Sequence, residues 1–114
     1  MNTFLICPVR GKDPEELMHI VKSLEAEGWN VHYPPRDTCQ DDPTGFQICK
    51  DNVSAIKEAD VIHIYYDPES RGSLFDLGVS FTLGKPIKIL NTIDKTQGKS
   101  FANMILDWES SGLV

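Results

Sequence analysis

The sequence predicts an α/β fold in which a small, doubly wound parallel sheet carries helices on both faces. Three observations lead to this prediction. Four short apolar or β-branched segments are spaced along the chain, segments with helical periodicity separate them, and proline, glycine and aspartate mark the breaks. Strands that alternate with helices form a parallel sheet, because the helix returns the chain to the start of the next strand. At 114 residues, the chain is predicted to form a single domain over residues 1–114.

The first strand and the first helix are predicted from clear local signals. Residues 4–7 are apolar, and a loop over 8–12 follows them. Asp13 can cap a helix there, Pro14 suits the first helical position and Gly28 ends the element. The apolar residues at helical spacing between them are Leu17, Ile20, Val21 and Leu24.

The middle of the chain is predicted to hold a strand, a long loop and a helix. Residues 29–33 form the strand, and the loop over 34–45 is rich in proline, aspartate and threonine. Long loops often carry function, although others are plain surface. The helix is predicted to end near Ala59, and its apolar face is made by Phe46, Cys49, Val53 and Ile56.

The last part of the chain continues the alternation. A β-branched and aromatic strand is predicted over 61–66, a helix from about 73 to 83 and a fourth strand over 86–90. A final helix is predicted over 100–108. The expected strand order is the flavodoxin-like order 2-1-3-4, in which ligands bind outside the carboxyl ends of strands one and three.

Two segments fall at that binding edge, residues 8–11 after the first strand and residues 67–76 after the third. The second segment ends at Asp76, which lies within the sequence GSLFDLG and is predicted in the first turn of an otherwise apolar helix. A carboxylate there either offsets the partial positive charge of the helix N-terminus or takes part in function. The convergence of the two segments favours a functional role.

The same two segments predict a small pocket for an anion and a sugar. Gly11 and Gly72 let backbone amides approach a ligand. Arg10 offers a guanidinium fork that suits phosphate, and Ser70 and Ser73 add hydroxyl donors near a helix N-terminus. Neither GxxxxGK[ST] nor GxGxxG occurs, so the sequence predicts neither a P-loop nor a dinucleotide fingerprint.

Composition narrows the possible partners. Eleven basic against seventeen acidic residues give a formal net charge of -6, which disfavours broad contact with nucleic acid or an anionic membrane. No apolar run approaches the roughly 20 residues of a membrane span and no secretory signal is evident, so a cytoplasmic protein is expected. Three cysteines and three histidines show no disulfide or metal-ligand spacing. No metal or cofactor is therefore expected.

With these residues in place, the chain resembles the nucleoside 2-deoxyribosyltransferase family, including the related deoxynucleoside-monophosphate N-glycosidases. The resemblance spans roughly residues 4–90. Its most specific part is AIKEAD at 55–60, the apolar strand after it, SRGS at 70–73 and FDLG at 75–78. It implies that Asp76 is the nucleophile that attacks C1′ of the sugar.

The resemblance also implies roles for other residues. Ser70, Arg10 and Gly11 resemble the 5′-phosphate site of the monophosphate-acting branch. An acidic residue on the second helix assists at the base in relatives, and here Asp51 is the acidic candidate whereas Asn52 is the position that aligns best. The loop over 33–40 resembles the family's base-contacting loop, which makes Gln40 a candidate reader of the nucleobase.

Two positions depart from the family pattern. The family commonly has glutamate where Asp76 stands, and a side chain one methylene shorter reaches about 1 Å less far toward C1′. The family also commonly has a tyrosine on the first strand that bonds the nucleophile, where this chain has Phe4. Tyr66 is a possible substitute, and its alternative role is a core aromatic.

Three functions are compared on these grounds. The first is an enzyme that cleaves or transfers the N-glycosidic bond of a nucleoside or nucleotide, through an oxocarbenium-like centre that a carboxylate stabilises or traps. The second is a catalytically inactive module that binds or senses a nucleotide in the same pocket. A phospho-accepting receiver domain would use Asp67, but residues 8–10 lack its acidic pair. By analogy with the family, a neighbouring subunit of a homo-oligomer is expected to close the pocket.

Overall fold

A four-stranded parallel sheet forms the centre of the protein, in a computed structural model that describes residues 1–9 and 13–112. The strand order is β2-β1-β3-β4, and every neighbouring pair is parallel. The strands are β1 (Asn2–Ile6), β2 (Asn30–His32), β3 (Val61–Ile64) and β4 (Ile87–Ile89). The predicted α/β fold and the predicted strand order are both confirmed.

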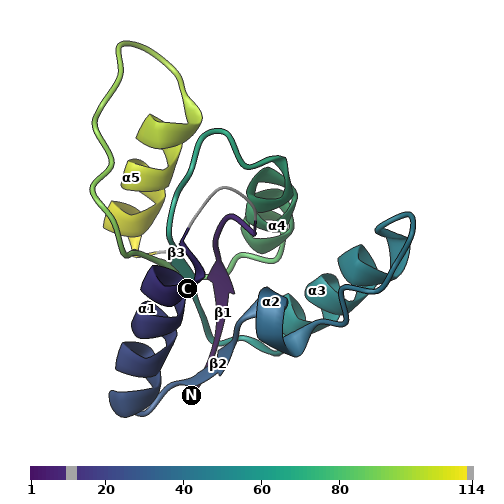
Figure 1. Ribbon diagram of the computed structural model, residues 1–114. Coiled ribbons are helices and arrows are strands. Elements are labelled where there is room, and N and C mark those ends of the chain that lie inside the picture. Colours follow the sequence, from purple (N-terminus) through teal and green to yellow (C-terminus); the bar gives the residue numbers. More distant parts are fainter. Residues whose placement is uncertain (10–12, 113–114) are drawn as a thin grey trace.

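Helices cover both faces of the sheet because successive strands are added first toward one edge of the sheet and then toward the other. From β1 the chain moves outward to β2, whereas from β3 it moves the other way to β4, so connections of one hand place their helices on opposite faces. In Figure 1, α1 lies to the left of β1, and α3 and α4 lie to its right. The helices are α1 (Pro14–Ala26), α2 (Pro34–Asp37), α3 (Phe46–Glu58), α4 (Arg71–Thr82) and α5 (Phe101–Ser111).

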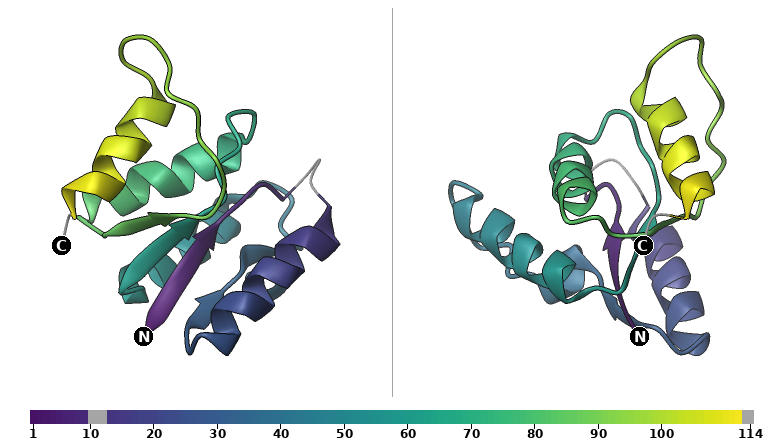
Figure 2. Two further views of the ribbon diagram at one scale, coloured as in Figure 1. Left: turned by 90° about the vertical axis from the view of Figure 1, so that its left-hand side faces the viewer. Right: turned by 180° about the vertical axis from the view of Figure 1, so that it is seen from behind.

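The last helix, α5, protects the open edge of the sheet at β4. Glu109 Oε2 accepts the backbone N–H of Ile89 at 2.6 Å, and the indole Nε1 of Trp108 donates to Lys85 O at 2.9 Å. The right-hand view of Figure 2 shows α5 and α3 on opposite sides of the molecule. None of the helices in the described ranges has the length and apolar character needed to cross a membrane.

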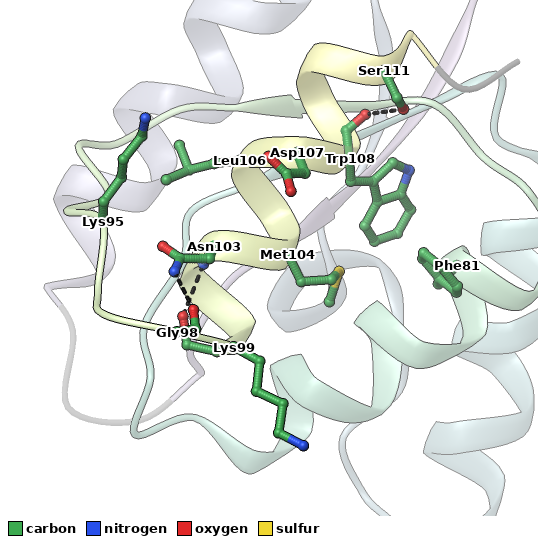
Figure 3. A pocket seen from close by; sticks show the side chains of 11 residues that line it. Phe81, Lys95, Gly98, Lys99, Asn103, Met104, Leu106, Asp107, Trp108 and Ser111 are labelled. Carbon is green, nitrogen blue, oxygen red and sulfur yellow. Dashed lines mark hydrogen bonds between the residues drawn. The ribbon is translucent and has the colours of Figure 1, made fainter.

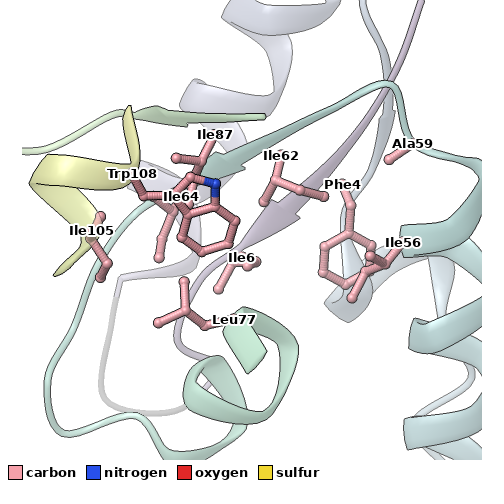
Figure 4. Close-up of a cluster of buried hydrophobic side chains, with 10 residues drawn as sticks. All are labelled: Phe4, Ile6, Ile56, Ala59, Ile62, Ile64, Leu77, Ile87, Ile105 and Trp108. Atoms are coloured by element: carbon pink, nitrogen blue, oxygen red, sulfur yellow. The ribbon is translucent and has the colours of Figure 1, made fainter. Parts of the chain in front are cut away.

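Two buried clusters, one on each side of the sheet, hold these layers together. Strand alternation directs Phe4 and Ile6 to one cluster, and Leu5 and Cys7 to the other. On the α4 side, Trp108 reaches from α5 under the sheet, as Figure 4 shows. The buried members of that cluster are Phe4, Ile6, Ile56, Ala59, Ile62, Ile64, Leu77, Ile87, Ile105 and Trp108.

The predicted loop over 34–45 contains a short helix that sequence analysis did not identify. Pro34 occupies the first position of α2, where its missing N–H costs no hydrogen bond, and Thr38 N donates back to Pro34 O at 3.0 Å. The carboxylate of Asp37 accepts the backbone N–H of Tyr33 at 2.8 Å. Two consecutive prolines were interpreted as a loop signal, although here they begin a helical turn.

The expectation that Asp76 lies in the first turn of its helix is wrong. Ser70 caps α4 by accepting the N–H of Ser73 at 3.3 Å, so the helix begins at Arg71, two residues earlier than predicted. Asp76 therefore lies in the second turn, and no acidic residue occupies the first. The macrodipole effect falls off within the first turn, so it does not account for this carboxylate.

Lys85 connects the start of β4 to the C-terminal end of α3. Its Nζ donates to Lys57 O at 2.9 Å and to Ala59 O at 2.8 Å. Carbonyl groups at the end of a helix lack intrahelical partners, and a cation there also interacts favourably with the helix dipole.

We expect Lys85→Met to lower the free energy of unfolding by about 1–2 kcal/mol, because the apolar stem remains but two carbonyl groups lose their donor. Urea unfolding followed by circular dichroism measures the change. Lys22→Met, the same substitution at an exposed position of α1, is the control and should change stability by less than about 0.5 kcal/mol. Equal stabilities of the two variants would contradict this role of Lys85.

Candidate functional site

A cavity of about 660 Å³ opens where the chain leaves β1 and β3. Cys7 and Val9 line it after β1, and Asp67 and Ser70 line it after β3. This is the point of the sheet at which strand order reverses, where open parallel sheets bind ligands. The other lining residues come from α2 and the loop after it, from α3, from the segment between β3 and α4, and from the first two turns of α4: Pro34, Gln40, Ile48, Cys49, Asn52, Glu69, Arg71, Gly72, Phe75 and Asp76.

Asp76 is the central charged group of this cavity. It is only 7% exposed, and its Oδ1 is a buried atom with no hydrogen-bond partner among the described residues. Burial raises the pKa of the Asp76 carboxyl from 3.8 to about 7, and hydrogen bonding by the Asn52 side chain acts in the opposite direction. The carboxylate can therefore accept or lose a proton near neutral pH.

Two contacts of α4 fix the direction of Asp76. The next residue, Leu77, is buried in the core cluster of Figure 4. One turn further along, the fully buried Ser80 donates its hydroxyl hydrogen to the backbone carbonyl of Asp76 at 2.8 Å. Because Leu77 anchors the helix in the core, the side chain before it is turned toward the cavity.

Asn52 brings the second polar group to the cavity. It lies on α3, which packs against α4, and it is 7% exposed. Its Oδ1 accepts a hydrogen bond from the Thr38 hydroxyl at 2.9 Å. The Nδ2 donor of the amide is thus left for Asp76 on the other side.

Cys7 forms part of the wall beside Asp76. Burial, followed by the charge of Asp76, raises the pKa of the Cys7 thiol to about 12. The thiol therefore stays neutral at physiological pH and adds no competing charge. Cys7 is a free thiol, and its position at the carboxyl end of the first predicted strand was the available signal that it lines the site.

The predicted serine and glycine residues lie at the start of α4. Ser70 and Gly72 line the cavity, and a Cβ added at Gly72 would meet no atom within 4 Å. Ser73 is buried and is not among the lining residues. It accepts the Ser70 hydroxyl hydrogen at 2.8 Å, which makes it part of the helix cap.

The structure separates the two candidates on α3. Asn52 lines the cavity, whereas Asp51 does not, and Asp51 Oδ1 accepts a hydrogen bond from Gln47 Nε2 at 2.8 Å on the exposed part of the helix. Successive residues of a helix point about 100° apart, so they cannot both face α4. Gln40 also lines the cavity, and its Nε2 donates to Pro34 O at 2.9 Å and to Thr38 O at 3.1 Å.

Of four further residues named in the sequence analysis, two fall outside the described part of the chain and two lie away from the cavity. Arg10 and Gly11 are outside the described residues. Phe4 is fully buried in the core cluster, where its ring stacks on His32 at a centroid distance of 5.3 Å. Tyr66 packs against the same cluster and does not line the cavity.

A second cavity, of about 680 Å³, lies between α5 and the loop before it, with Phe81 of α4 at one side (Figure 3). Met104 and Trp108 contribute apolar surface, and Asn103 Nδ2 binds the loop through Gly98 O at 2.6 Å and Thr96 O at 2.8 Å. None of the predicted site residues lines this cavity. The candidate site is therefore the cavity that contains Asp76.

Burial of the Asp76 carboxyl predicts a pH-dependent cost to stability. In the unfolded chain the group ionises above about pH 4, whereas in the folded protein it keeps its proton until about pH 7. The unfolded state therefore binds fewer protons in this window, and stability falls as pH rises through it. The full penalty, at most about 4 kcal/mol for a shift of this size, is present above pH 7.

We expect Asp76→Asn to be more stable than the wild type at pH 8 and much closer to it at pH 4. Urea unfolding at the two pH values gives the two differences in free energy. Asp51→Asn, the same substitution outside the cavity, serves as the control and should show no such pH dependence. A stability gain of Asp76→Asn over the wild type that is no larger at pH 8 than at pH 4 would contradict the inference that the buried, ionised carboxylate destabilises the fold.

Comparisons with known proteins find similar folds and a matching family. One structure of similar fold is a 2-deoxyribosyltransferase from the psychrotolerant bacterium Bacillus psychrosaccharolyticus, with a TM-score of 0.61 and 25% sequence identity, covering 78% of this chain and 71% of that one. Another is the Clostridium botulinum CMP N-glycosidase BcmB, with a TM-score of 0.62 and 21% identity, covering 78% and 70%. At that identity the second likeness supports the fold alone.

No curated protein sequence matches this chain. A family model does match it: the model described as nucleoside 2-deoxyribosyltransferase aligns with residues 4–107, which include all of the residues that line the Asp76 cavity. The chain belongs to the nucleoside 2-deoxyribosyltransferase family.

Proposed function

We propose that the protein cleaves the N-glycosidic bond of a nucleoside or nucleoside monophosphate, with Asp76 as the nucleophile at C1′. One observation carries the proposal: a buried carboxylate, with one oxygen unpartnered among the described residues, faces a cavity at the ligand-binding edge of the sheet. Membership of a family of enzymes that act on small nucleoside or nucleotide substrates supports it. Structural ion pairing does not explain Asp76, because no basic side chain neutralises it in the described part of the chain.

The proposed reaction has two steps. An Asp76 oxygen bonds C1′ while the bond from C1′ to the base nitrogen breaks, and the electron pair of that bond leaves with the base, which takes up a proton. Water then attacks C1′, the bond from C1′ to the Asp76 oxygen breaks with its electron pair on the carboxylate, and the proton that water releases balances the one taken up by the base, which completes hydrolysis. If a second base attacks instead, the product is a new nucleoside, so transfer and hydrolysis use the same residues.

The base is proposed to lie near α3 and the loop after β2. Gln40 and Asn52 line that side of the cavity and carry amide groups that can pair with nucleobase edges. Asp51 was also expected to assist the departing base. Because Asp51 lies outside the cavity lining, we assign the contact at this site to Asn52.

The sugar's 5′ end is proposed to lie near the start of α4. Ser70 and Gly72 line the cavity there, and a helix N-terminus favours an anion. Arg71 supplies a positive charge among the lining residues, while Asp67 and Glu69 supply negative charge at the same rim. We propose that Arg10 and Gly11, at the end of the other segment of the sheet edge, complete a 5′-phosphate site.

A second candidate function is a catalytically inactive module that binds or senses a nucleotide. The observation that favours it is the length of Asp76, which is one methylene shorter than the glutamate common in the family. Such a protein would keep the cavity and its polar contacts but hold the carboxylate short of C1′. Tight binding of a nucleotide without release of free base would support this function.

We expect Asp76→Ala to reduce release of free base by more than about 1,000-fold, because it removes the nucleophile. Purified protein is incubated with a panel of nucleosides and their 5′-monophosphates, and free base is measured by chromatography. Wild-type rates should fall about tenfold per pH unit below the pKa of Asp76, which lies at about 7, because the nucleophile must be ionised. The panel also decides whether a 5′-phosphate is required.

Asp51→Asn is the matched control for this experiment and should retain most of the activity. If Asp51→Asn lost as much activity as Asp76→Ala, Asp51 rather than Asn52 would be the residue that assists the departing base. Retention of most base release by Asp76→Ala, in a protein shown to be folded, would end the proposal that Asp76 is the nucleophile.

We also propose that the protein forms a homo-oligomer through the outer surfaces of α3 and α4. Phe46 is 70% exposed and Phe75 is 44% exposed on this side of the molecule. Phe75 lines the Asp76 cavity and also two apolar hollows beside it, whose other members include Val53 and Leu83. A second copy that covers this surface would also narrow the mouth of the cavity.

We expect Phe46→Glu to shift the oligomer toward monomer, because it places a charge on the apolar surface that is proposed to be covered. Light scattering coupled to size-exclusion chromatography measures the mass. Phe101→Glu is the matched control, since Phe101 is 54% exposed on α5, away from this surface. A wild-type protein that is monomeric at all concentrations tested would overturn the proposal.

A further inference from the structure

A chain of three polar side chains leads from the edge strand of the sheet to the carboxylate of Asp76. His32 lies on β2, Thr38 directly follows α2, and Asn52 lies on α3. His32 Nε2 lies 2.8 Å from Thr38 Oγ1, and Thr38 Oγ1 lies 2.9 Å from Asn52 Oδ1. Thr38 and Asn52 are buried, so water does not readily replace either contact.

The direction of the hydrogen bonds follows from the chemistry of the central hydroxyl. Threonine carries a single hydroxyl hydrogen, and Thr38 donates it to Asn52 Oδ1. The Thr38 oxygen can then only accept from His32, which requires a hydrogen on His32 Nε2. With its Oδ1 occupied, the Asn52 amide presents its Nδ2 hydrogens toward Asp76.

The surrounding structure holds each link of this chain in place. The imidazole of His32 stacks on the ring of Phe4, with an angle of 9° between the two planes. The turn of α2 fixes Thr38, whose N–H donates to Pro34 O at 3.0 Å and whose carbonyl accepts from Gln40 Nε2 at 3.1 Å. The segment between β2 and α3 thus forms a fixed support for Asn52.

We propose that Thr38, itself held by His32, is a positioning residue that keeps the Nδ2 of Asn52 turned toward Asp76 and so favours the ionised form of that carboxylate. The proposal rests on the proposed function only in giving the ionised form its role as nucleophile. An amide turned the other way would place its oxygen against the carboxylate and disfavour its charge. Thr38 and His32 act through Asn52 and have no contact of their own with the reacting atoms.

Other charged groups lie near these hydrogen-bonded side chains, and a test has to hold constant their effects on the pKa of Asp76. Burial lowers the pKa of His32, which keeps the ring neutral at neutral pH, while Asp37 and Asp51 act to raise its pKa and Arg36 acts to lower it. Arg36 is paired with Asp37 at 2.8 Å. At the other end, the Cys7 thiol interacts with the charge of Asp76, and Asp67, Glu69 and Arg71 line the same cavity. A substitution confined to Thr38 leaves all of these charges in place.

The test measures the ionisation of Asp76 directly by carbon-13 NMR of its carboxyl group. Asp76→Asn assigns the signal, and the titration is repeated in Thr38→Val, which keeps the shape of the side chain and removes its hydroxyl. We expect the pKa of Asp76 to rise by about one pH unit in Thr38→Val. Thr38→Ser, which keeps the hydroxyl, should restore the wild-type value. An unchanged or lowered pKa in a folded Thr38→Val protein would overturn the proposal.

A second measurement uses the wild-type protein and does not depend on whether a variant folds. The side-chain amide of Asn52 gives a signal in proton–nitrogen NMR spectra. We expect its two hydrogens to shift in step with the titration of Asp76, and to show proximity to the β hydrogens of Asp76 rather than to Thr38. Proximity to Thr38 instead would show that the amide is turned the opposite way, which contradicts the proposal.

The activity assay adds a readout that separates the two proposals. If base is released, Thr38→Val should move the acid limb of the pH profile upward by the same amount as the pKa of Asp76, whereas mere loss of structure would lower rates equally at every pH. A profile that does not move would overturn the role of Thr38 and leave the nucleophile intact. If no substrate releases base, the proposed function fails, while a raised pKa in Thr38→Val would still support the positioning role.

Discussion

The burial of one carboxylate is the constraint on which the other features of this protein depend. Removing an ionised carboxylate from water is costly unless donors replace the lost hydration, and one oxygen of Asp76 has no hydrogen-bond partner among the described residues. A protein under selection for stability alone would gain by replacing this side chain. Its place in the wall of a cavity supports the proposal that this group serves chemistry at the expense of stability.

The sheet supplies the rigidity that such a group needs. Parallel strands β1 and β3 end together at the point where strand order reverses, which brings Cys7 and Ser70 to the same cavity from segments far apart in the chain. The buried Leu77 then sets the rotation of α4, and Ser80 holds the backbone of Asp76 itself. Small errors in this rotation would turn the carboxylate toward solvent, so the core and the site are specified by the same contacts.

Much of this arrangement is predictable from sequence because its signals are local. Alternating strands and helices, the cap of the first helix, and an acidic residue within an otherwise apolar helix start are all visible along the chain. The turn of α2 was not predicted because a pair of prolines is found in loops as well as at the first positions of helices. The choice between Asp51 and Asn52 depends on how α3 is rotated against α4, and no pattern within the helix determines that angle.

The polar chain through His32 and Thr38 was beyond sequence analysis for a different reason. No sequence spacing distinguishes His32, and its partners lie 6 and 28 positions away, on other elements. Each contact becomes visible only when β2, α2 and α3 are placed together in space. Such hydrogen-bond networks leave no periodic pattern in the sequence, because their members lie on different helices and strands.

Substrate binding increases the demand on this network. A ligand that fills the cavity, or a second copy that covers its mouth, displaces water from around Asp76 and lowers the local dielectric constant. Desolvation alone would then raise the pKa of Asp76 further above 7 and leave the carboxyl protonated at the stage where the proposed reaction requires it to attack. The same fall in dielectric constant strengthens the hydrogen bond from Asn52, whose orientation Thr38 fixes before the ligand arrives. A donor set in advance by buried contacts therefore offsets part of the penalty at the stage of the reaction where that penalty is largest.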